Sequence, residues 1–421
     1  MKRILFGISI IIGIGFGPRL YSQVLTDSNY STLVSSITLY RSGIDQERPT
    51  MLLGSNDRLL LRFDWLDEEP TTFRYTFRHC DAEWQADEME PYEYLQGFEE
   101  GIIDQYDPSI NTLQHYYNYH QYLPTDGTTL QISGNYLLIV RLDDNPDSIV
   151  FTRRIQVTEN LINGGNEVVR PTSGMRIMQD QEVNVWLAEK PDLEFGTYLP
   201  FTFSPTYLKV VLQQNGRTDN MRQLPFSGYC GGQLCYRWKD ENCYAGGNPF
   251  RYFDISNMHA TMYNVLRVEE YGGELFGMLR PEEDRSGKPY IGHEGLNGGM
   301  KVNVWDRNDP NTEADYIWVN FSLPMARPML NGSIHVVGEL TQWQLDSHSE
   351  MEWNQQYKAY TKRLLLKQGY YAYQLLFKPY GEQQGLTATL EGDHVETPNT
   401  YHLYVYYRFP GDRYDRLLLV R

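Results

Sequence analysis

The chain has 421 residues, enough for about three domains of ordinary size. Its composition, 41% hydrophobic and 22% charged, is that of a folded globular protein and excludes a disordered or collagen-like chain. A formal net charge of −17 argues against a nucleic-acid binder, which needs a basic surface, and the 33 Tyr residues favour β-sheets.

The first 22 residues have the pattern of a cleavable secretory signal. Lys2 and Arg3 precede an apolar run, residues 4–16, that is too short to cross a bilayer. Cleavage is expected between Ser22 and Gln23, and it would remove three basic residues and no acid, which leaves a mature net charge of −20. Because no later segment reaches the length of a spanning helix, we expect an exported protein in the periplasm or at the cell surface.

Segments of alternating apolar and polar residues recur along the chain, and this period of two predicts β-strands. They fall into three groups, at residues 59–63, 73–78, 135–140 and 150–157; at 183–187, 209–214, 301–305 and 316–321; and at 333–338, 360–366, 369–377, 401–408 and 415–420. Turn-forming residues at 143–147 join two of these segments into a predicted hairpin. The best helix candidate lies at residues 257–270.

Gly- and Pro-containing stretches separate the three groups of strands. Residues 160–171 form a connector, and Pro324 and Pro328 mark a second boundary. We therefore predict an all-β fold of three consecutive immunoglobulin-like β-sandwich domains with long loops. After the signal peptide at residues 1–22, the predicted domains cover residues 23–160, 161–325 and 326–421.

Four cysteines follow the signal, and three of them lie close together in the sequence. The spacing of Cys230, Cys235 and Cys243 does not match that of zinc ligands. An oxidising compartment permits disulfides, and we expect one in this loop, between Cys235 and Cys243. Cys80 stands between aromatic segments and is expected to be a buried free thiol.

The common catalytic motifs are absent from the sequence. It contains no nucleophile elbow, phosphate-binding loop or metalloprotease motif, so we predict no catalytic residue, no metal ligand and no cofactor. His79 beside Cys80 suggests a thiol nucleophile, but neighbours on a strand point to opposite faces, so Cys80 and Trp84 are expected to pack inside. Paired carboxylates of an exported glycoside hydrolase are a further alternative.

The tyrosines have two interpretations, as sheet-covering core residues or as an interaction surface. We favour packing, with the excess available for an interface. A binding alternative comes from residues 337–343 and 369–373, which resemble strands of glycogen-binding sandwich domains. In that case Trp343, Trp353 and Tyr373 of the C-terminal sandwich would form a sugar-stacking platform, and the protein would be a secreted carbohydrate-binding protein.

A series of longer motifs, in order along the chain, resembles the plug protein family of the bacteroidete type IX secretion system. These motifs begin with Phe-Arg-His-Cys-Asp-Ala-Glu-Trp at residues 77–84 and continue at 93–98, 111–119, 133–138, 151–154, 214–220, 248–254, 368–373 and 391–401. The resemblance covers the whole mature chain. The Cys-rich segment at residues 230–243 departs from it.

The resemblance implies a non-enzymatic periplasmic protein. It would bind the giant outer-membrane β-barrel translocon and occlude its periplasmic opening while no substrate is in transit. It implies no cofactor, no nucleic-acid partner and no membrane span, so that the protein would sit on the inner side of the outer membrane through its partner. In some bacteria the same system supports gliding motility. No site residue is carried over from the family.

Overall fold

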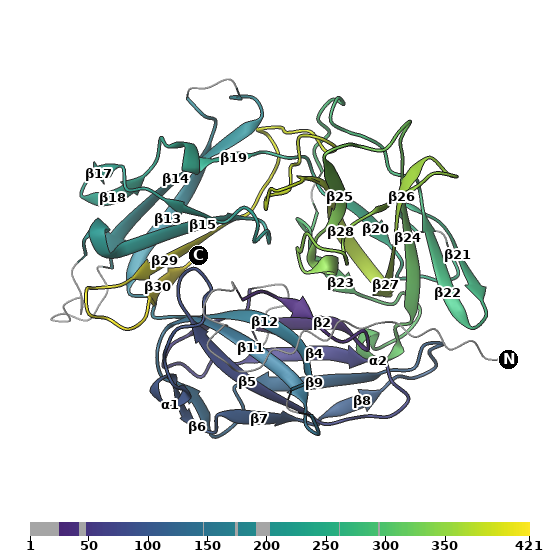
Figure 1. The fold of residues 1–421 in the computed structure, drawn as a ribbon, viewed down its shortest axis with the longest axis horizontal. Coiled ribbons are helices and arrows are strands. Elements are labelled where there is room, and N and C mark those ends of the chain that lie inside the picture. The colour runs from purple at the N-terminus through teal and green to yellow at the C-terminus, as the bar shows by residue number, and fades with distance from the viewer. Residues whose placement is uncertain are drawn as a thin grey trace.

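Three lobes of β-strands meet at a common centre, as Figure 1 shows. The structure is a computed structural model that describes residues 25–41, 48–145, 147–172, 176–190, 203–260, 262–293 and 295–421. The predicted signal peptide, with its cleavage point between Ser22 and Gln23, lies outside the described residues. Each lobe has its own hydrophobic core. The predicted all-β class is confirmed, and the immunoglobulin-like arrangement within each lobe stays a prediction.

The first lobe, residues 25–160, forms from strands with one apolar face. In β5 (Phe73–Cys80), Phe73, Tyr75 and Phe77 are buried and the residues between them are half-buried. Its six-stranded sheet contains β1 (Ser28–Asn29), β3 (Thr50–Leu52), β5, β7 (Glu100–Ile103), β11 (Gly134–Leu142) and β12 (Ile149–Thr158). The predicted hairpin is confirmed, because β11 and β12 pair antiparallel.

A second sheet closes the other side of this core. This sheet contains β2 (Val34–Arg41), β4 (Leu59–Trp65), β9 (Tyr117–Leu123) and β8 (Tyr106–Pro108). A separate two-stranded sheet is formed by β6 (Leu95–Gly97) and β10 (Thr128–Leu130). Between the sheets the rings of Phe63 and Tyr119 stack with their centroids 5.1 Å apart. The short helix α1 (Pro91–Tyr94) begins with a capping box between Glu90 and Glu93 and leads into β6.

The second lobe combines residues 161–247 with the last strands of the chain. One sheet contains β13 (Ile162–Val169), β14 (Asp180–Glu189), β17 (Gly228–Cys230), β18 (Gln233–Tyr236) and β19 (Cys243–Ala245). The other contains β15 (Leu208–Gln214), β16 (Arg222–Leu224), β29 (Tyr401–Tyr407) and β30 (Arg416–Val420). Single turns of 3-10 helix precede β15, at Pro205–Tyr207, and β19, at Asp240–Asn242.

The third lobe, residues 248–399, is inserted between β19 and β29 of the second. One layer contains β20 (Arg251–Asp254), β23 (Met300–Val302), β25 (Gly332–Val337) and β28 (Gly369–Pro379). The other contains β21 (Val265–Tyr271), β22 (Glu274–Leu279), β24 (Tyr316–Pro324), β26 (Glu352–Asn354) and β27 (Ala359–Lys367). Short helical turns occur at α2 (Pro310–Glu313) and at Glu339–Thr341.

The strand pairing does not follow the predicted domains 161–325 and 326–421. β24 ends at Pro324 and pairs along its whole length with β27, so the boundary at residue 325 passes through one sheet. The C-terminal strand β29 instead pairs with β15 of the second lobe. The polar and Pro-containing residues near 325 are therefore a connection within the third lobe.

The helix predicted at residues 257–270 is wrong. Val265–Tyr271 is strand β21, which forms a hairpin with β22. Gly272 and Gly273, both at positive φ, make the two-residue turn that joins the strands. This Gly-Gly pair is a hairpin signal that outweighs the modest helical pattern before it. Among the described residues no helix is long and apolar enough to cross a membrane.

Candidate functional site

The first and third lobes are joined by a buried ion pair. Lys367 Nζ lies 2.6 Å from Asp64 Oδ2, and the Tyr316 hydroxyl donates to the same oxygen at 2.6 Å. The side chains of Lys367 and Asp64 are 1% and 0% exposed. Burial lowers the pKa of Lys367 from its ordinary value, and the neighbouring Asp64 opposes that effect. Moving the lobes apart would leave each charge buried without its partner, which is costly. The pair therefore fixes the two lobes against each other.

The first and second lobes are also joined by buried polar groups. The backbone N–H of Ala82 donates to Asp415 Oδ2 at 3.0 Å, and the Tyr406 hydroxyl donates to Asn135 Oδ1 at 2.9 Å. All four residues are buried. Since buried hydrogen-bonding groups that lose their partners are costly, these contacts resist separation of the two lobes.

A cavity of about 690 Å³ lies where the three lobes meet. Its lining includes Arg48, Arg153 and Arg154 of the first lobe, Gln213 and Tyr404 of the second, and Glu339 and Trp343 of the third. Arg48 crosses the junction: it donates to the Tyr404 hydroxyl and, at 2.7 Å, to the carbonyl oxygen of Asn215. The cavity is thus a space between lobes, lined by both polar and apolar side chains, rather than a gap within one core.

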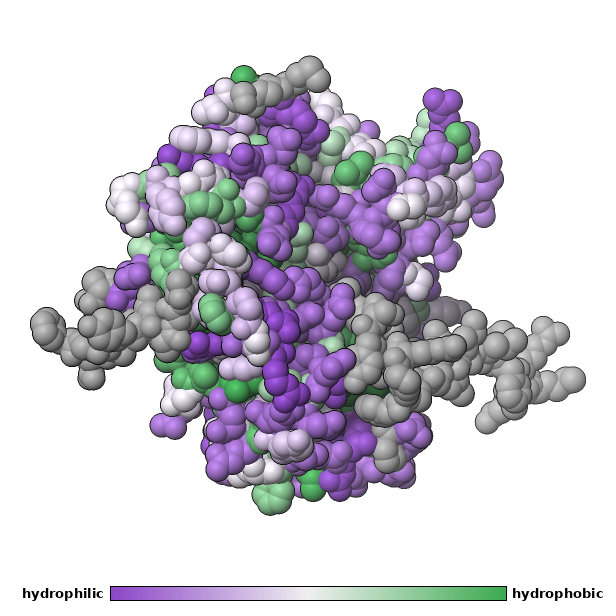
Figure 2. Space-filling model, turned by 60° about the vertical axis from the view of Figure 1, so that its left-hand side comes forward, coloured by the Kyte–Doolittle hydropathy of each residue, from purple (hydrophilic) through white to green (hydrophobic). Residues whose placement is uncertain are grey.

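The first lobe also has exposed large side chains along one margin, which meets the second lobe at α1, where Glu93 pairs with Arg413. In Figure 1, α1, β6, β7 and β8 follow this margin at the bottom of the molecule. Its exposed large side chains are Tyr92, Phe98, Ile102 and Tyr106, of which Tyr92 and Phe98 are 74% and 69% exposed. We call these four residues the outer margin. In Figure 2 the lower end of the molecule is mostly hydrophilic, with isolated hydrophobic side chains.

Acidic residues surround the outer margin. Residues 34–159 contain 22 Asp and Glu against nine Arg and no Lys, a formal net charge of −13, so most of the chain's −17 lies in the first lobe. Glu88, Glu99 and Asp104 are exposed beside the outer margin and have no ion-pair partner among the described residues. The margin therefore combines aromatic and apolar contact area with uncompensated negative charge.

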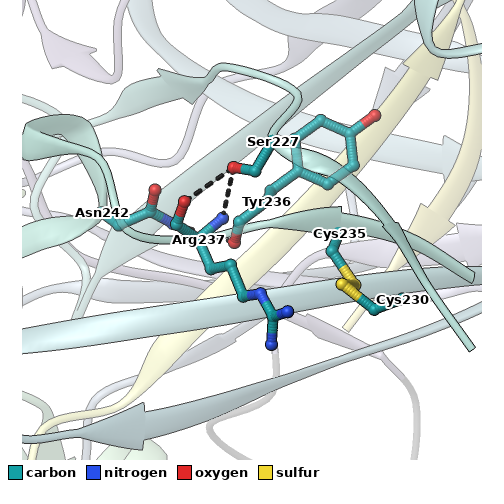
Figure 3. Close-up of a disulfide and its surroundings, with 6 residues drawn as sticks. All are labelled: Ser227, Cys230, Cys235, Tyr236, Arg237 and Asn242. Atoms are coloured by element: carbon teal, nitrogen blue, oxygen red, sulfur yellow. Dashed lines mark hydrogen bonds between the residues drawn. A yellow bond between two sulfur atoms is a disulfide. The ribbon is translucent and has the colours of Figure 1, made fainter.

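The disulfide differs from the predicted one. The structure joins Cys230 to Cys235 (Figure 3). Cys243 is free. Cys230 and Cys235 lie on the hairpin strands β17 and β18, with their Cα atoms 6.0 Å apart. Cys235 and Cys243 lie on two different strands that both pair with β14. Cys235 is opposite Trp186, and Cys243 is opposite Glu182, four residues away along β14. Four residues along a strand are about 13 Å, beyond the reach of a disulfide. Cys80, as predicted, is a buried free thiol.

The predicted sugar-stacking residues do not form a platform. Tyr373 is fully buried, and its hydroxyl donates to Glu282. The Trp343 ring fills the space beside Gly216 of the second lobe and Gly298, where a Cβ atom would clash with it, so Trp343 is a contact between lobes. Trp353 packs edge-on against Tyr360 on the other layer of the third lobe.

The structure instead gathers a different set of rings on the third lobe. Tyr252 and Tyr263 stack with their centroids 4.1 Å apart, and Tyr370 and His293 lie 5.5 and 5.2 Å from Tyr252. Tyr263 is 57% exposed. From the sequence, the period of two along residues 369–373 places Tyr370 on the opposite face of the strand from Tyr371 and Tyr373. Only the pairing of the strands shows which of the two faces packs into the core.

The sequence's other candidate groups are held in structural contacts. Cys80 and Trp84 pack together, as expected, and burial raises the pKa of Cys80 to about 12, which disfavours a thiolate. His79, on the other face of β5, is paired with Asp87. In the part of the chain that the structure describes, no group of His, Cys, Asp and Glu is arranged to hold a metal ion.

The buried carboxylates of the third lobe are likewise engaged. Glu391 lies between Arg251, at 2.9 Å, and Arg285, and Glu282 binds the other side of Arg251. Burial pushes the pKa of Glu391 upward, but the two arginines outweigh it and hold that pKa below its ordinary value. These are ion pairs of the core and not two free carboxylates facing a cleft.

Comparisons with known proteins agree with this architecture. Residues 34–159, which include the core of the first lobe, match a family model described as "Type 9 secretion system plug protein 1st domain". The whole chain is similar to the crystal structure of a hypothetical protein from Parabacteroides merdae, with 32% identity and a TM-score of 0.89 over 94% of this chain and 98% of that one. No curated protein sequence matches the chain. With its first lobe matched as this domain and all three lobes shared with a solved relative, the chain belongs to the plug protein family of the type IX secretion system.

Proposed function

We propose that this protein is the periplasmic plug of the type IX translocon: it binds the giant outer-membrane β-barrel and occludes its periplasmic opening while no substrate is in transit. The observation that carries the proposal is the match of residues 34–159 to the plug domain. The protein would be exported by its signal peptide and would stay on the inner side of the outer membrane through its partner. Its role would be binding, without a catalytic step.

The arrangement of the lobes supports this role. An occluding protein must keep its shape against an opening, and the three lobes are tied by buried polar contacts such as Lys367–Asp64 and Ala82–Asp415. Each lobe also has its own apolar core. A body of this kind blocks a pore by its bulk and needs no metal or cofactor to do so.

The outer margin is the surface we propose for docking. Tyr92 and Phe98 offer the large amphipathic contact area that is common in protein interfaces. Glu88, Glu99 and Asp104 add negative charge, which would steer the first lobe to a basic rim on the translocon. Steering between exposed charges weakens as salt screens them, so the association rate should fall with ionic strength.

The experiment is affinity purification of the tagged protein from outer membranes, with variants on two lobes. The wild type is expected to bring down a very large β-barrel protein. The double variant Glu99→Lys, Asp104→Lys should capture at least tenfold less of it, whereas the matched control Glu270→Lys, Glu382→Lys on the third lobe should capture as much as the wild type. Absence of a large β-barrel partner from the wild-type sample would overturn the plug function; equal capture by all variants, or capture insensitive to salt, would overturn the docking surface alone.

A second function, carbohydrate binding, is favoured by the ring cluster of Tyr252, Tyr263, Tyr370 and His293. Exposed tyrosine rings on a sheet can stack on sugars, although such a fold by itself assigns no ligand. Intrinsic fluorescence measured against a panel of α-glucans tests this alternative. A change that disappears in Tyr263→Ala would support it, and unchanged fluorescence would contradict it.

A further inference from the structure

The cavity between the lobes holds an excess of positive charge. Among the described lining residues, Arg48, Arg153, Arg154 and Arg421 stand against the two acidic side chains of Asp27 and Glu339, and the fifth arginine, Arg41, has a further interaction of its own. This is the reverse of the chain as a whole, which has a formal net charge of −17. Positive charge gathered in a partly apolar cavity favours a compensating anion, because buried charge without a partner is costly.

Three of these arginines, Arg48, Arg153 and Arg154, make no ion pair shorter than 4 Å with an acidic side chain of the described residues. Instead they donate to neutral oxygens. Arg153 donates to the Thr152 carbonyl at 2.7 Å, and Arg154 donates from Nε to the Leu25 carbonyl at 2.8 Å. Neutral acceptors orient a guanidinium, but they leave its charge in place.

Part of each guanidinium stays available. Nε of Arg48, Nε of Arg153 and Nη1 of Arg154 donate to none of the described residues. The bonds that these arginines do make hold them in fixed positions at the cavity wall. Preplaced guanidinium groups with free N–H donors are what carboxylate and phosphate groups bind best.

The acidic groups that the structure describes in the lining do not balance this charge. Burial lowers the pKa of Arg48 to about 9 and that of Arg153 to about 10, with Asp27 acting against the decrease in both. Burial raises the pKa of Glu339, which weakens it as a counter-ion. Burial and the charge of Arg48 lower the pKa of His402, a further lining residue, to about 3, so its ring is neutral at pH 7.

We propose that the junction cavity is a binding site for a multivalent oxyanion, a ligand with two or more carboxylate or phosphate groups. Arg48, Arg153 and Arg154 would bind the charged groups. The amide of Gln213 and the indole of Trp343, which also line the cavity, would contact the rest of the ligand. The volume of about 690 Å³ is ample for a tricarboxylic acid and falls in the range of small-molecule sites. Because all three lobes contribute, bound ligand would hold them together. This site is separate from the outer margin and does not depend on the proposed docking.

The test uses the purified full-length protein and four probes at matched ionic strength: citrate, inorganic phosphate, a tetraglutamate peptide and sodium chloride. Citrate or the peptide is expected to bind by calorimetry and to change the fluorescence of Trp343, whereas chloride should do neither. Tighter binding of the peptide would identify a chain segment as the source of the carboxylates, and tighter binding of citrate or phosphate would identify a free oxyanion.

Variants locate the binding in the cavity. Arg48→Gln should weaken citrate binding at least tenfold, and Arg363→Gln, a matched change on the outer face of β27, should leave it unchanged. Glu339→Gln removes a competing carboxylate; its amide oxygen can accept from the Met300 N–H and its NH2 group can donate to the Tyr40 hydroxyl, so it should tighten binding. The gain in Glu339→Gln tests the site even if Arg48→Gln does not fold. No binding by any of the oxyanions, or equal binding by wild type and Glu339→Gln, would overturn the proposal.

Discussion

At the scale of single residues, Asp64 and Lys367 show how the sequence joins distant parts of the chain. The two lie 303 positions apart, and each is buried in the contact between lobes. Neither position differs from an ordinary surface charge when the sequence alone is considered, because a strand pattern does not reveal the neighbouring lobe. What makes them important is that each would be an unpaired buried charge without the other.

Removing one partner of this pair should be costly. Lys367→Met leaves Asp64 without its cation and is expected to lower the free energy of unfolding by about 3–5 kcal/mol. The double variant Lys367→Met, Asp64→Asn should recover part of that loss, because no buried charge remains. Guanidinium unfolding followed by tryptophan fluorescence measures both. The control Lys288→Met breaks an exposed pair with Glu283 and should cost less than about 1 kcal/mol. A loss for Lys367→Met as small as that of the control would show that the pair does not hold the lobes.

His335 should make the protein sensitive to mild acid. Burial lowers its pKa to about 4, and its two ring nitrogens lie 2.7 and 2.9 Å from the hydroxyls of Ser333 and Ser349. In the unfolded chain the pKa is about 6.5, so between pH 6.5 and 4 the unfolded state binds a proton that the folded state does not, and stability falls with pH.

The shift corresponds to about 3 kcal/mol over that range. We expect the free energy of unfolding of the wild type to fall by about this much more than that of His335→Gln when the pH is lowered from 7 to 4. Urea unfolding of both proteins at several pH values measures the difference. Parallel pH profiles would contradict the assignment.

At the scale of the elements, the Cys230–Cys235 disulfide closes the end of one hairpin. Ser227 Oγ donates to the Arg237 carbonyl at 2.7 Å and accepts from the Arg237 N–H at 2.8 Å, so the other end of the hairpin is also held (Figure 3). The bond spans only five positions of sequence, and closing so short a loop stabilises a protein by about 2 kcal/mol.

A tryptic digest without reduction distinguishes the two pairings. Cleavage after Arg222, Arg237, Lys239 and Arg251 releases residues 223–237 and 240–251 as separate peptides. The Cys230–Cys235 bond predicts peptide 223–237 at its own mass less two hydrogen atoms, with Cys243 free to react with iodoacetamide. A cross-linked species that contains both peptides would instead show the Cys235–Cys243 bond.

Strands could be predicted from the sequence because their signal is local, whereas the path of the chain between lobes could not. The alternation in residues 73–78 and 150–157 is visible without neighbours, and both segments are strands. The return of β29 to β15 depends on contacts between residues about 190 positions apart, for which a period of two carries no information. The disulfide partner was missed for the same reason, since only the register of β14 places Cys243 away from Cys235.

The predictions of functional residues divide in the same way, between local sequence signals and contacts between distant residues. Tyrosines as core residues could be predicted, and 11 of the 12 largest fully buried side chains are tyrosines. The stacking platform could not, because Trp343 packs against the second lobe, Trp353 lies on β26 and Tyr373 faces inward. The junction cavity is built from Arg48, Arg153 and Arg154, which the sequence shows only as scattered charges.

At the scale of the whole molecule, charge is distributed unevenly. The first lobe contains most of the negative charge and the outer margin, and the cavity at the junction collects arginines. The third lobe, inserted into the second, completes a body whose three cores are tied by buried polar contacts. In the proposed plug function, the acidic first lobe would dock and the other two lobes would add bulk.

The measurement that tests this account most directly is the conductance of the purified translocon in a planar bilayer, with this protein added on the periplasmic side. The account predicts that the conductance falls toward that of the empty bilayer, that the Glu99→Lys, Asp104→Lys variant closes the channel only at much higher concentration, and that Glu270→Lys, Glu382→Lys behaves as the wild type. A translocon that binds the protein and keeps its full conductance would contradict it.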